Sequence, residues 1–363
     1  MDIRIMEMME GARNCVRGIA NIQKDENVLL LVDTSGFAHP LVIESLAAAC
    51  QEVGAEVVSA MCREFEPRFE EPAKIIQQAL LASDVVLFVS SHEAIIHSRW
   101  GRIAILEYGS RLVPVLANTP EIMASEWARF PPDIYYAIAK WVYKRIVKSK
   151  TMRVTSAGGT DISCGLSPGH MMGFPQGIDG VPAPPTPKLG QFTMFPPGVF
   201  GIMPRHPSNG LIVYDALLGF KGLCKQPVKV TIEDGWVANI EGGEEAKWFE
   251  ELIKEKKKEG ISTADSFQEV MWGLNPKASI ERGLEITHLR EGELTRRAGT
   301  LHFGIGVGSR GFHWDGILIK PFTVYADNEL IIENGRLKAL DDPEIREIAR
   351  KFGDPDKLLT ELP

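Results

Sequence analysis

The chain has 363 residues, of which 44% are hydrophobic and 24% charged, and its formal net charge is −8 at pH 7. This composition is typical of a soluble globular enzyme or binding protein, the length favours two domains, and the acidic balance argues against a nucleic-acid partner. Since no run of eighteen apolar residues occurs, no membrane-spanning segment is predicted. The N-terminus does not resemble a signal peptide, and five scattered cysteines without CxxC spacing indicate reduced thiols, so a cytoplasmic protein is expected.

Apolar runs and helical patterns alternate through the first 150 residues. They predict strands at 28–33, 55–61, 84–90 and 111–117, and helices at 40–53, 72–82, 99–108 and 132–149. This alternation predicts a Rossmann-like, doubly wound parallel-sheet α/β domain over residues 1–150. The first strand is followed by DTSGFAHP, which has one glycine instead of the GxGxxG fingerprint, so no nucleotide cofactor is expected.

Basic side chains follow the third predicted strand, within SSHEAIIHSRWGRIA at 90–104. They lie near the carboxyl end of a strand, where α/β domains bind ligands. One interpretation is a helix N-terminus with solvated basic residues, which we favour for His92. The other is a contact with an anion or a partner, which stays open for His97 and Arg99.

Residues 151–363 predict a second, α+β domain. Strands are expected at 211–218, 228–232 and 236–240, an amphipathic helix at 244–258, and a hairpin followed by a short helix near the C-terminus. Residues 164–210 are rich in glycine and proline yet too apolar for a disordered linker, so we expect this segment to line a site. His170 and His206 lie in it. Both positions are more typical of structural or exposed histidines, and His170 is kept as a candidate.

The stretch 298–319, AGTLHFGIGVGSRGFHWDGILI, places two histidines and an aspartate in an otherwise apolar, glycine-rich setting. His313 and Asp315 are two residues apart, so on a strand both side chains point to one face. His302 lies in a similar setting. Imidazole together with carboxylate suits zinc, iron(II) or manganese. The alternative is two half-buried histidines and a turn aspartate, but the same-face pair favours a metal site.

Glu269 lies in TADSFQEVMWGLNPKA, among valine, methionine, tryptophan and leucine. It is either a carboxylate at a helix end or on the surface, or a third or fourth metal ligand. The second interpretation follows from its neighbours, because a buried carboxylate in apolar surroundings needs a charged partner.

Several motifs occur together in an order that resembles a known superfamily: GTDIS, GQFTMFPPGVFGIMP, VTIEDGWVANIEGG, QEVMWGLNPKA and GTLHFGIG…HWDGIL. The chain resembles the superfamily that joins 2,5-dihydroxypyridine 5,6-dioxygenase to the thermophilic metallo-aminopeptidases of the aminopeptidase T type. The resemblance covers most of the chain. It implies a metal-dependent enzyme that acts on a small-molecule substrate and forms a homo-oligomer.

The two branches of this superfamily imply different metal sites. The dioxygenase branch implies one Fe2+ held by two histidines and one carboxylate. Its His-x-Asp pair matches His313 and Asp315, and Glu269 stands where its other histidine would fall, unless His302 takes that place. The peptidase branch implies two metal ions (Zn2+, Mn2+ or Co2+) and matches all four residues. Its first glutamate would align with FPPGVF, which has no acid, and its tyrosine with Ser309.

The leading hypothesis is a metal-binding C-terminal domain in a non-haem iron(II) dioxygenase that cleaves a small hydroxylated N-heterocycle such as 2,5-dihydroxypyridine. The expected metal ligands are Glu269, His302, His313 and Asp315. Of these, His302 and Glu269 are also expected to act in catalysis.

A flat ring would be held by the apolar and aromatic residues of FTMFPPGVFGIMP. The expected substrate contacts are Phe195, Pro197, Phe200 and His170. Two other classes stay open: a metal-dependent aminopeptidase or amide hydrolase, and a non-catalytic binding protein.

Overall fold

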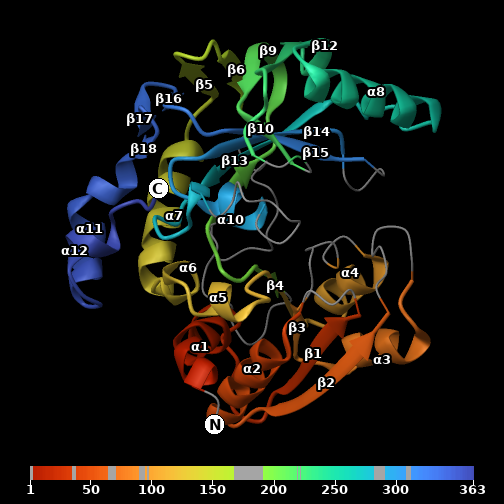
Figure 1. The fold of residues 1–363 in the computed structure, drawn as a ribbon, viewed down its shortest axis with the longest axis vertical. Helices are drawn as coiled ribbons and strands as arrows, with labels where there is room; N and C mark the ends of the chain where they lie inside the picture. Colours follow the sequence, from red (N-terminus) through yellow and green to blue (C-terminus); the bar gives the residue numbers. More distant parts are fainter. Residues whose placement is uncertain are drawn as a thin grey trace. The chain divides into compact units, whose positions relative to one another are not determined.

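The computed structural model describes residues 3–34, 38–63, 71–89, 95, 98–166, 191–218, 220, 222–281, 291–307 and 312–363. The chain divides into two compact units (Figure 1). Unit 1 comprises Met1–Tyr136 and Phe174–Pro197, and unit 2 comprises Ala137–Gly173 and Gly198–Pro363. The helix α7 (Pro132–Ile146) contains the first change from one unit to the other. The domain boundary expected at residue 150 stays a prediction.

Unit 1 is built on a five-stranded sheet in the order β2-β1-β3-β4-β7, in which every neighbouring pair is parallel. The strands are β1 (Asn27–Asp33), β2 (Glu56–Cys62), β3 (Val85–Val89), β4 (Arg111–Val115) and β7 (Gln191–Phe192). The helices are α1 (Ile3–Arg13), the π-helix η1 (Asn14–Ile19), α2 (Pro40–Glu52), α3 (Lys74–Ala82), α4 (Arg99–Leu106), α5 (Pro120–Met123) and α6 (Glu126–Arg129).

Different helices cover the two faces of this parallel sheet. On one face, Leu29 and Leu31 of β1 and Phe88 of β3 pack with Leu80 of α3 and Ala104 of α4. The intervening residues of β1 point to the other face, where α2 lies beside β1. Helices on both faces confirm the predicted doubly wound α/β class.

Unit 2 contains two antiparallel sheets, in agreement with the predicted α+β class. The larger sheet has the order β12-β11-β9-β6-β5-β16-β17-β18 and the smaller has the order β10-β15-β14-β13-β8. The strands of the larger sheet are β5 (Thr151–Ser156), β6 (Asp161–Gly165), β9 (Arg205–Tyr214), β11 (Val228–Glu233), β12 (Trp236–Glu241), β16 (Phe322–Ala326), β17 (Glu329–Glu333) and β18 (Arg336–Leu337). Those of the smaller sheet are β8 (Val199–Ile202), β10 (Ala216–Leu217), β13 (Phe267–Gly273), β14 (Leu301–Ile305) and β15 (Trp314–Leu318).

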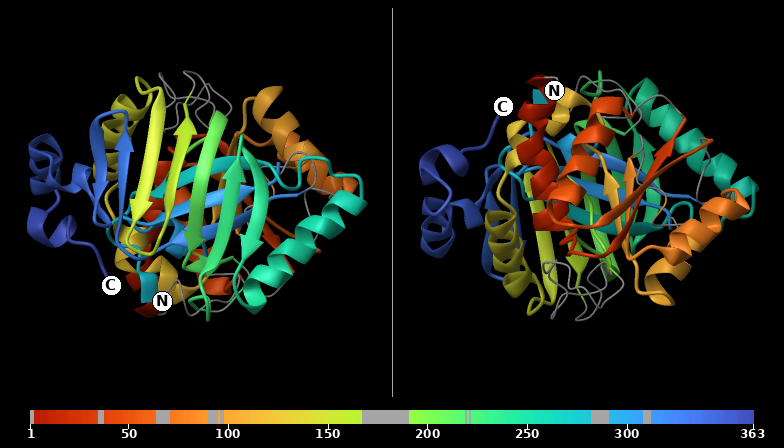
Figure 2. Two further views of the ribbon diagram at one scale, coloured as in Figure 1. Left: turned by 90° about the horizontal axis from the view of Figure 1, so that it is seen from above. Right: turned by 90° about the horizontal axis from the view of Figure 1, so that it is seen from below.

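Helices and a hydrophobic core complete unit 2. Besides residues 137–146 of α7, its described helices are α8 (Glu244–Lys258), α10 (Glu291–Arg296), η5 (Lys338–Asp341), α11 (Pro343–Arg350) and α12 (Pro355–Leu358). The two sheets lie one on the other, with α8 beside β11 and β12 (Figure 2). Between the two sheets, the hydroxyl of Tyr214 donates to the carbonyl of Phe303 over 3.3 Å, and the centroids of the two rings lie 6.4 Å apart.

Among the described residues, no helix reaches the length and apolar character that crossing a bilayer requires.

Candidate metal centre

Three neighbouring strands of unit 2 carry candidate ligands on one face of the smaller sheet. Gly304 of β14 lies between Glu269 of β13 and Asp315 of β15, and His302 is two residues before it on the same strand. A β-bulge after Phe267 interrupts the alternation of β13, so that Phe267 and Glu269 point to opposite faces. We call the face that carries Glu269, His302 and Asp315 the metal face, and the opposite one the core face.

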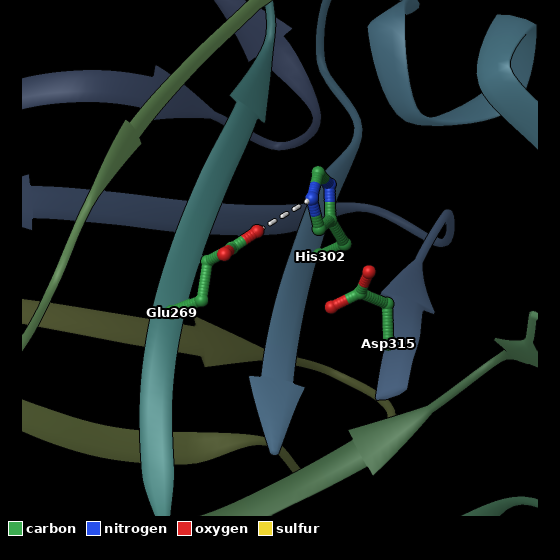
Figure 3. A group of neighbouring side chains, drawn as sticks. All are labelled: Glu269, His302 and Asp315. Carbon is green, nitrogen blue, oxygen red and sulfur yellow. Dashed lines mark ion pairs between the residues drawn. The ribbon is translucent and has the colours of Figure 1, made fainter. Parts of the chain in front are cut away.

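The side chains of these three residues point toward one another (Figure 3). Each offers one ligand atom, and the three atoms lie within 4.8 Å of one another. Nε2 of His302 is 3.4 Å from Oε1 of Glu269. Glu269 is only 8% exposed and lies in the middle of a strand. Its alternative interpretation as a carboxylate at a helix end or on the surface is therefore wrong.

His313 directly precedes β15 and joins the group. Its Nε2 lies 3.0 Å from Oδ1 of Asp315 and 3.5 Å from Oε2 of Glu269, and its Nδ1 lies 3.0 Å from the carbonyl oxygen of Gly306. An Nδ1–H donated to this carbonyl fixes the ring and turns Nε2 toward the carboxylates. Metal-ligating histidines are commonly held in this way.

Opposing effects act on the charge of His313. Burial lowers its pKa, but the charges of Asp315 and Glu269 and the hydrogen bonds to Asp315 and Gly306 raise it, and the result is a pKa of about 10. A proton therefore partly balances the two carboxylates when no cation is bound.

The spacing and chemistry of the four side chains fit a divalent cation. Two ligands about 2.1 Å from one ion, at angles of roughly 90–110°, lie roughly 3.0–3.4 Å apart. The separations of 3.0, 3.4 and 3.5 Å between nitrogen and oxygen atoms are close to that range. Among the described residues, the buried Nδ1 of His302 has no hydrogen-bond partner. Two carboxylates in a water-poor setting also need positive charge nearby, so the residues fit the metal that their chemistry implies.

The predicted substrate contacts are described only in part. His170 lies outside the described residues, as do His92 and His97, and so does the side chain of Phe200. Phe195 and Pro197 are buried residues of unit 1. A role in substrate binding stays a prediction for Phe195, Pro197, Phe200 and His170.

One residue without a role in the sequence reasoning anchors the strand that carries the His-x-Asp pair. Trp314 lies between His313 and Asp315, and its indole Nε1–H donates to the carbonyl of Leu218 over 2.9 Å. Its ring packs edge-on against Trp248 of α8, with 5.2 Å between centroids. The tryptophan inside the HWD motif is the sequence signal that could have identified this anchor.

Comparisons with known proteins place this geometry in context. The family model for 2,5-dihydroxypyridine 5,6-dioxygenase matches residues 13–339. The 2,5-dihydroxypyridine 5,6-dioxygenase of Pseudomonas putida KT2440 is 24% identical over 280 residues, which is 70% of this chain and 72% of that relative.

Two solved structures share the fold. The 2,5-dihydroxypyridine dioxygenase from Pseudomonas putida KT2440 aligns with a TM-score of 0.70 and 19% identity, over 93% of this chain and 97% of that one. Wild-type AmpT from Thermus thermophilus aligns with a TM-score of 0.61 and 15% identity, over 92% and 99% of the two chains. The resemblance inferred from the motifs is confirmed: since the family model spans most of its length, the chain belongs to the 2,5-dihydroxypyridine 5,6-dioxygenase family.

Proposed function

We propose that this chain is a non-haem iron(II) dioxygenase that opens the ring of a small hydroxylated N-heterocycle such as 2,5-dihydroxypyridine. The observation that carries the proposal is the group of converging imidazoles and carboxylates on the metal face, in a chain of this family. The proposed ligands are Glu269, His302, His313 and Asp315.

Each side chain of the metal face has a distinct task in this proposal. An Fe2+ ion would supply the redox chemistry with oxygen that amino-acid side chains lack. Glu269 and Asp315 offset the charge of the cation, and the Gly306 carbonyl keeps the ring of His313 oriented. His302 serves either as a ligand through Nε2 or as a base that accepts the proton of a ring hydroxyl at Nδ1.

Apolar neighbours limit the access of water to these groups. Met271 and Ile317 pair with His302 from the two adjacent strands and are 7% and 0% exposed. A dry environment strengthens the electrostatic interactions at a metal site.

The proposal also keeps the expected binding partners. Phe195, Pro197, Phe200 and His170 are assigned to the flat ring of the substrate. The homo-oligomer implied by the resemblance is part of the proposal, and light scattering measures it directly.

The decisive experiment measures oxygen consumption. The protein is purified without oxygen, loaded with Fe2+, and mixed with a panel of hydroxypyridines in air-saturated buffer. We expect oxygen uptake with at least one ring, loss of uptake in Asp315→Ala, and normal uptake in Glu233→Gln, which changes an exposed carboxylate on β11. An iron-loaded protein that consumes oxygen with none of the rings contradicts the proposal.

One observation favours a second candidate, the metal-dependent hydrolysis of a peptide or amide bond. Glu269 gives the metal face two carboxylates, and such a donor set suits zinc or manganese better than two imidazoles with one carboxylate would. A bound metal would then lower the pKa of a water molecule and polarise the carbonyl group. Hydrolysis of aminoacyl amides by the zinc- or cobalt-loaded protein without oxygen would select this candidate over the first.

A further inference from the structure

Gly304 occupies the centre of the metal face, although its backbone does not require glycine. It pairs with Glu269 on one side and with Asp315 on the other. It is not among the glycines with positive φ, so an L-residue could adopt its conformation. Glycine weakens a strand interior, and where it occurs there it often marks a close approach of another group.

The groups that approach Gly304 are the candidate ligands themselves. A Cβ atom added at this position would lie 2.3 Å from Cε1 of His313, 2.8 Å from Oδ1 of Asp315 and 2.8 Å from Cβ of Glu269. These distances are shorter than non-bonded heavy atoms tolerate. A single methyl group would therefore push apart three side chains that come from two other parts of the chain.

We propose that Gly304 is a positioning residue, whose missing side chain lets His313, Asp315 and Glu269 close around one small divalent cation. The inference rests on the proposed metal site and extends it to a residue that binds nothing itself. It predicts that the metal affinity of this chain depends on the size of residue 304 more than on the size of other crowded glycines in the same sheet.

Two strand glycines of the same sheet provide matched controls. A Cβ at Gly201 would meet Cγ and Cε of Met271 at 2.7 and 2.8 Å, and a Cβ at Gly316 would meet the ring of Tyr214 at 2.4 Å. Neither has a positive φ. Gly316 is about as crowded as Gly304, Gly201 is less so because only the flexible side chain of Met271 opposes it, and neither glycine has a candidate ligand among its contacts.

The first test compares metal affinity. Metal-free wild type, Gly304→Ala, Gly201→Ala and Gly316→Ala are titrated with Zn2+ and Co2+ in competition with a chromophoric chelator. We expect Gly304→Ala to lose affinity by about 10–100-fold, the range typical for groups that orient ligands, while both controls stay within about threefold of wild type. Equal affinities of Gly304→Ala and wild type would overturn the inference and leave the proposed function intact. A wild type that binds no ion would overturn both.

The second test applies even if Gly304→Ala unfolds easily. The urea midpoints of the metal-free wild type, Gly304→Ala, His313→Ala and the double variant form a double-mutant cycle. Because the nearest contact of the added methyl is the ring of His313, we expect the double variant to have a higher midpoint than Gly304→Ala alone. Strictly additive effects of the two substitutions would show that residue 304 does not press on His313, which would contradict the inference.

Discussion

The two faces of the smaller sheet of unit 2 differ in almost every respect, although the same five strands form both. On β14, Leu301 and Phe303 are fully buried on the core face, while His302 and Gly304 alternate with them on the metal face. The core face packs against the larger sheet through Tyr214. On β14, the period of two in a strand thus separates the large apolar side chains from the candidate ligand His302 and from Gly304.

This separation has an energetic side. The core face gains from burial and close packing of large apolar side chains. The metal face brings two carboxylates together in a setting with little water, which costs free energy unless a cation or a proton balances them. Substitutions on the core face should therefore impair folding, and substitutions on the metal face should impair metal binding.

The largest expected effect is on the core face. Phe303→Ala removes a ring that packs on Tyr214 and on Phe267, at 6.4 and 5.7 Å between centroids, and should destabilise the protein by roughly 3–5 kcal/mol. Urea unfolding of the metal-free protein measures this loss. Tyr325→Ala, on a half-exposed aromatic side chain of β16, should cost about 1 kcal/mol or less. Similar losses in the two variants would show that the core face does not carry the stability.

The next prediction concerns the His-x-Asp pair on the metal face. His313→Ala and Asp315→Ala should each remove stoichiometric metal, since both take away a donor atom, while the fold survives on the intact core face. Elemental analysis of the purified variants gives the metal content, and circular dichroism reports the fold. If either variant retains one ion per chain, the site lies elsewhere.

A smaller effect is expected for Glu269→Gln. The amide oxygen of glutamine is a poorer ligand than a carboxylate, so affinity for Zn2+ and Fe2+ should fall by about 10–100-fold. Glu269→His should retain Fe2+, because it moves the donor set toward two imidazoles and one carboxylate. Back-titration of the metal-free variants measures both affinities. Unchanged affinity in Glu269→Gln would make this glutamate a structural residue.

The smallest prediction concerns pH. His313 has a pKa of about 10 in the metal-free protein, so at pH 7 a cation has to displace a proton from its ring. Metal affinity should therefore rise with pH, by up to about tenfold per unit below pH 10. The metal-free protein should lose stability as the pH rises from the ordinary histidine range to about 10. The raised pKa of His313 stabilises the fold fully below that range, and this contribution disappears as the pH approaches about 10.

Calorimetry measures directly whether metal binding releases the proton of His313. Titration of Zn2+ at pH 7.5 in two buffers with different enthalpies of ionisation should show about one proton released per ion. His313→Ala, in conditions where it still binds weakly, should release none. Absence of proton release in the wild type would contradict a ligand role for His313.

The regular elements could be predicted because each carries a local signal. Residues 244–258 form α8 within the predicted bounds, as the amphipathic pattern and the basic C-terminal turn indicate. The apolar run at 28–33 lies within β1. By contrast, β7 has only two residues, and its pairing with β4 depends on contacts far away in the sequence. A local pattern cannot reveal such a strand.

The candidate site could be predicted only as far as local spacing extends. The two-residue spacing of His313 and Asp315 is enough to place their side chains side by side, with Nε2 of His313 3.0 Å from Oδ1 of Asp315. The orientation of Glu269 depends on the bulge in β13, and the place of Gly304 between the two carboxylates depends on the register of three strands. Bulges and register arise from the whole sheet, so neither follows from one segment.

The discontinuous course of the chain has a consequence for dissection of the molecule. The chain leaves unit 1 after Tyr136. Residues 174–197 belong to unit 1 again, and they include β7 at the edge of the parallel sheet. A protein truncated at residue 150 would lack this strand, and β4, whose Leu112, Val113 and Val115 are buried, would become an unpaired edge, which is prone to aggregation. Expression of the N-terminal half alone should therefore yield insoluble material, whereas a fusion that supplies residues 174–197 should recover it. During synthesis, the ribosome must likewise pass residue 197 before all five strands of the parallel sheet are available.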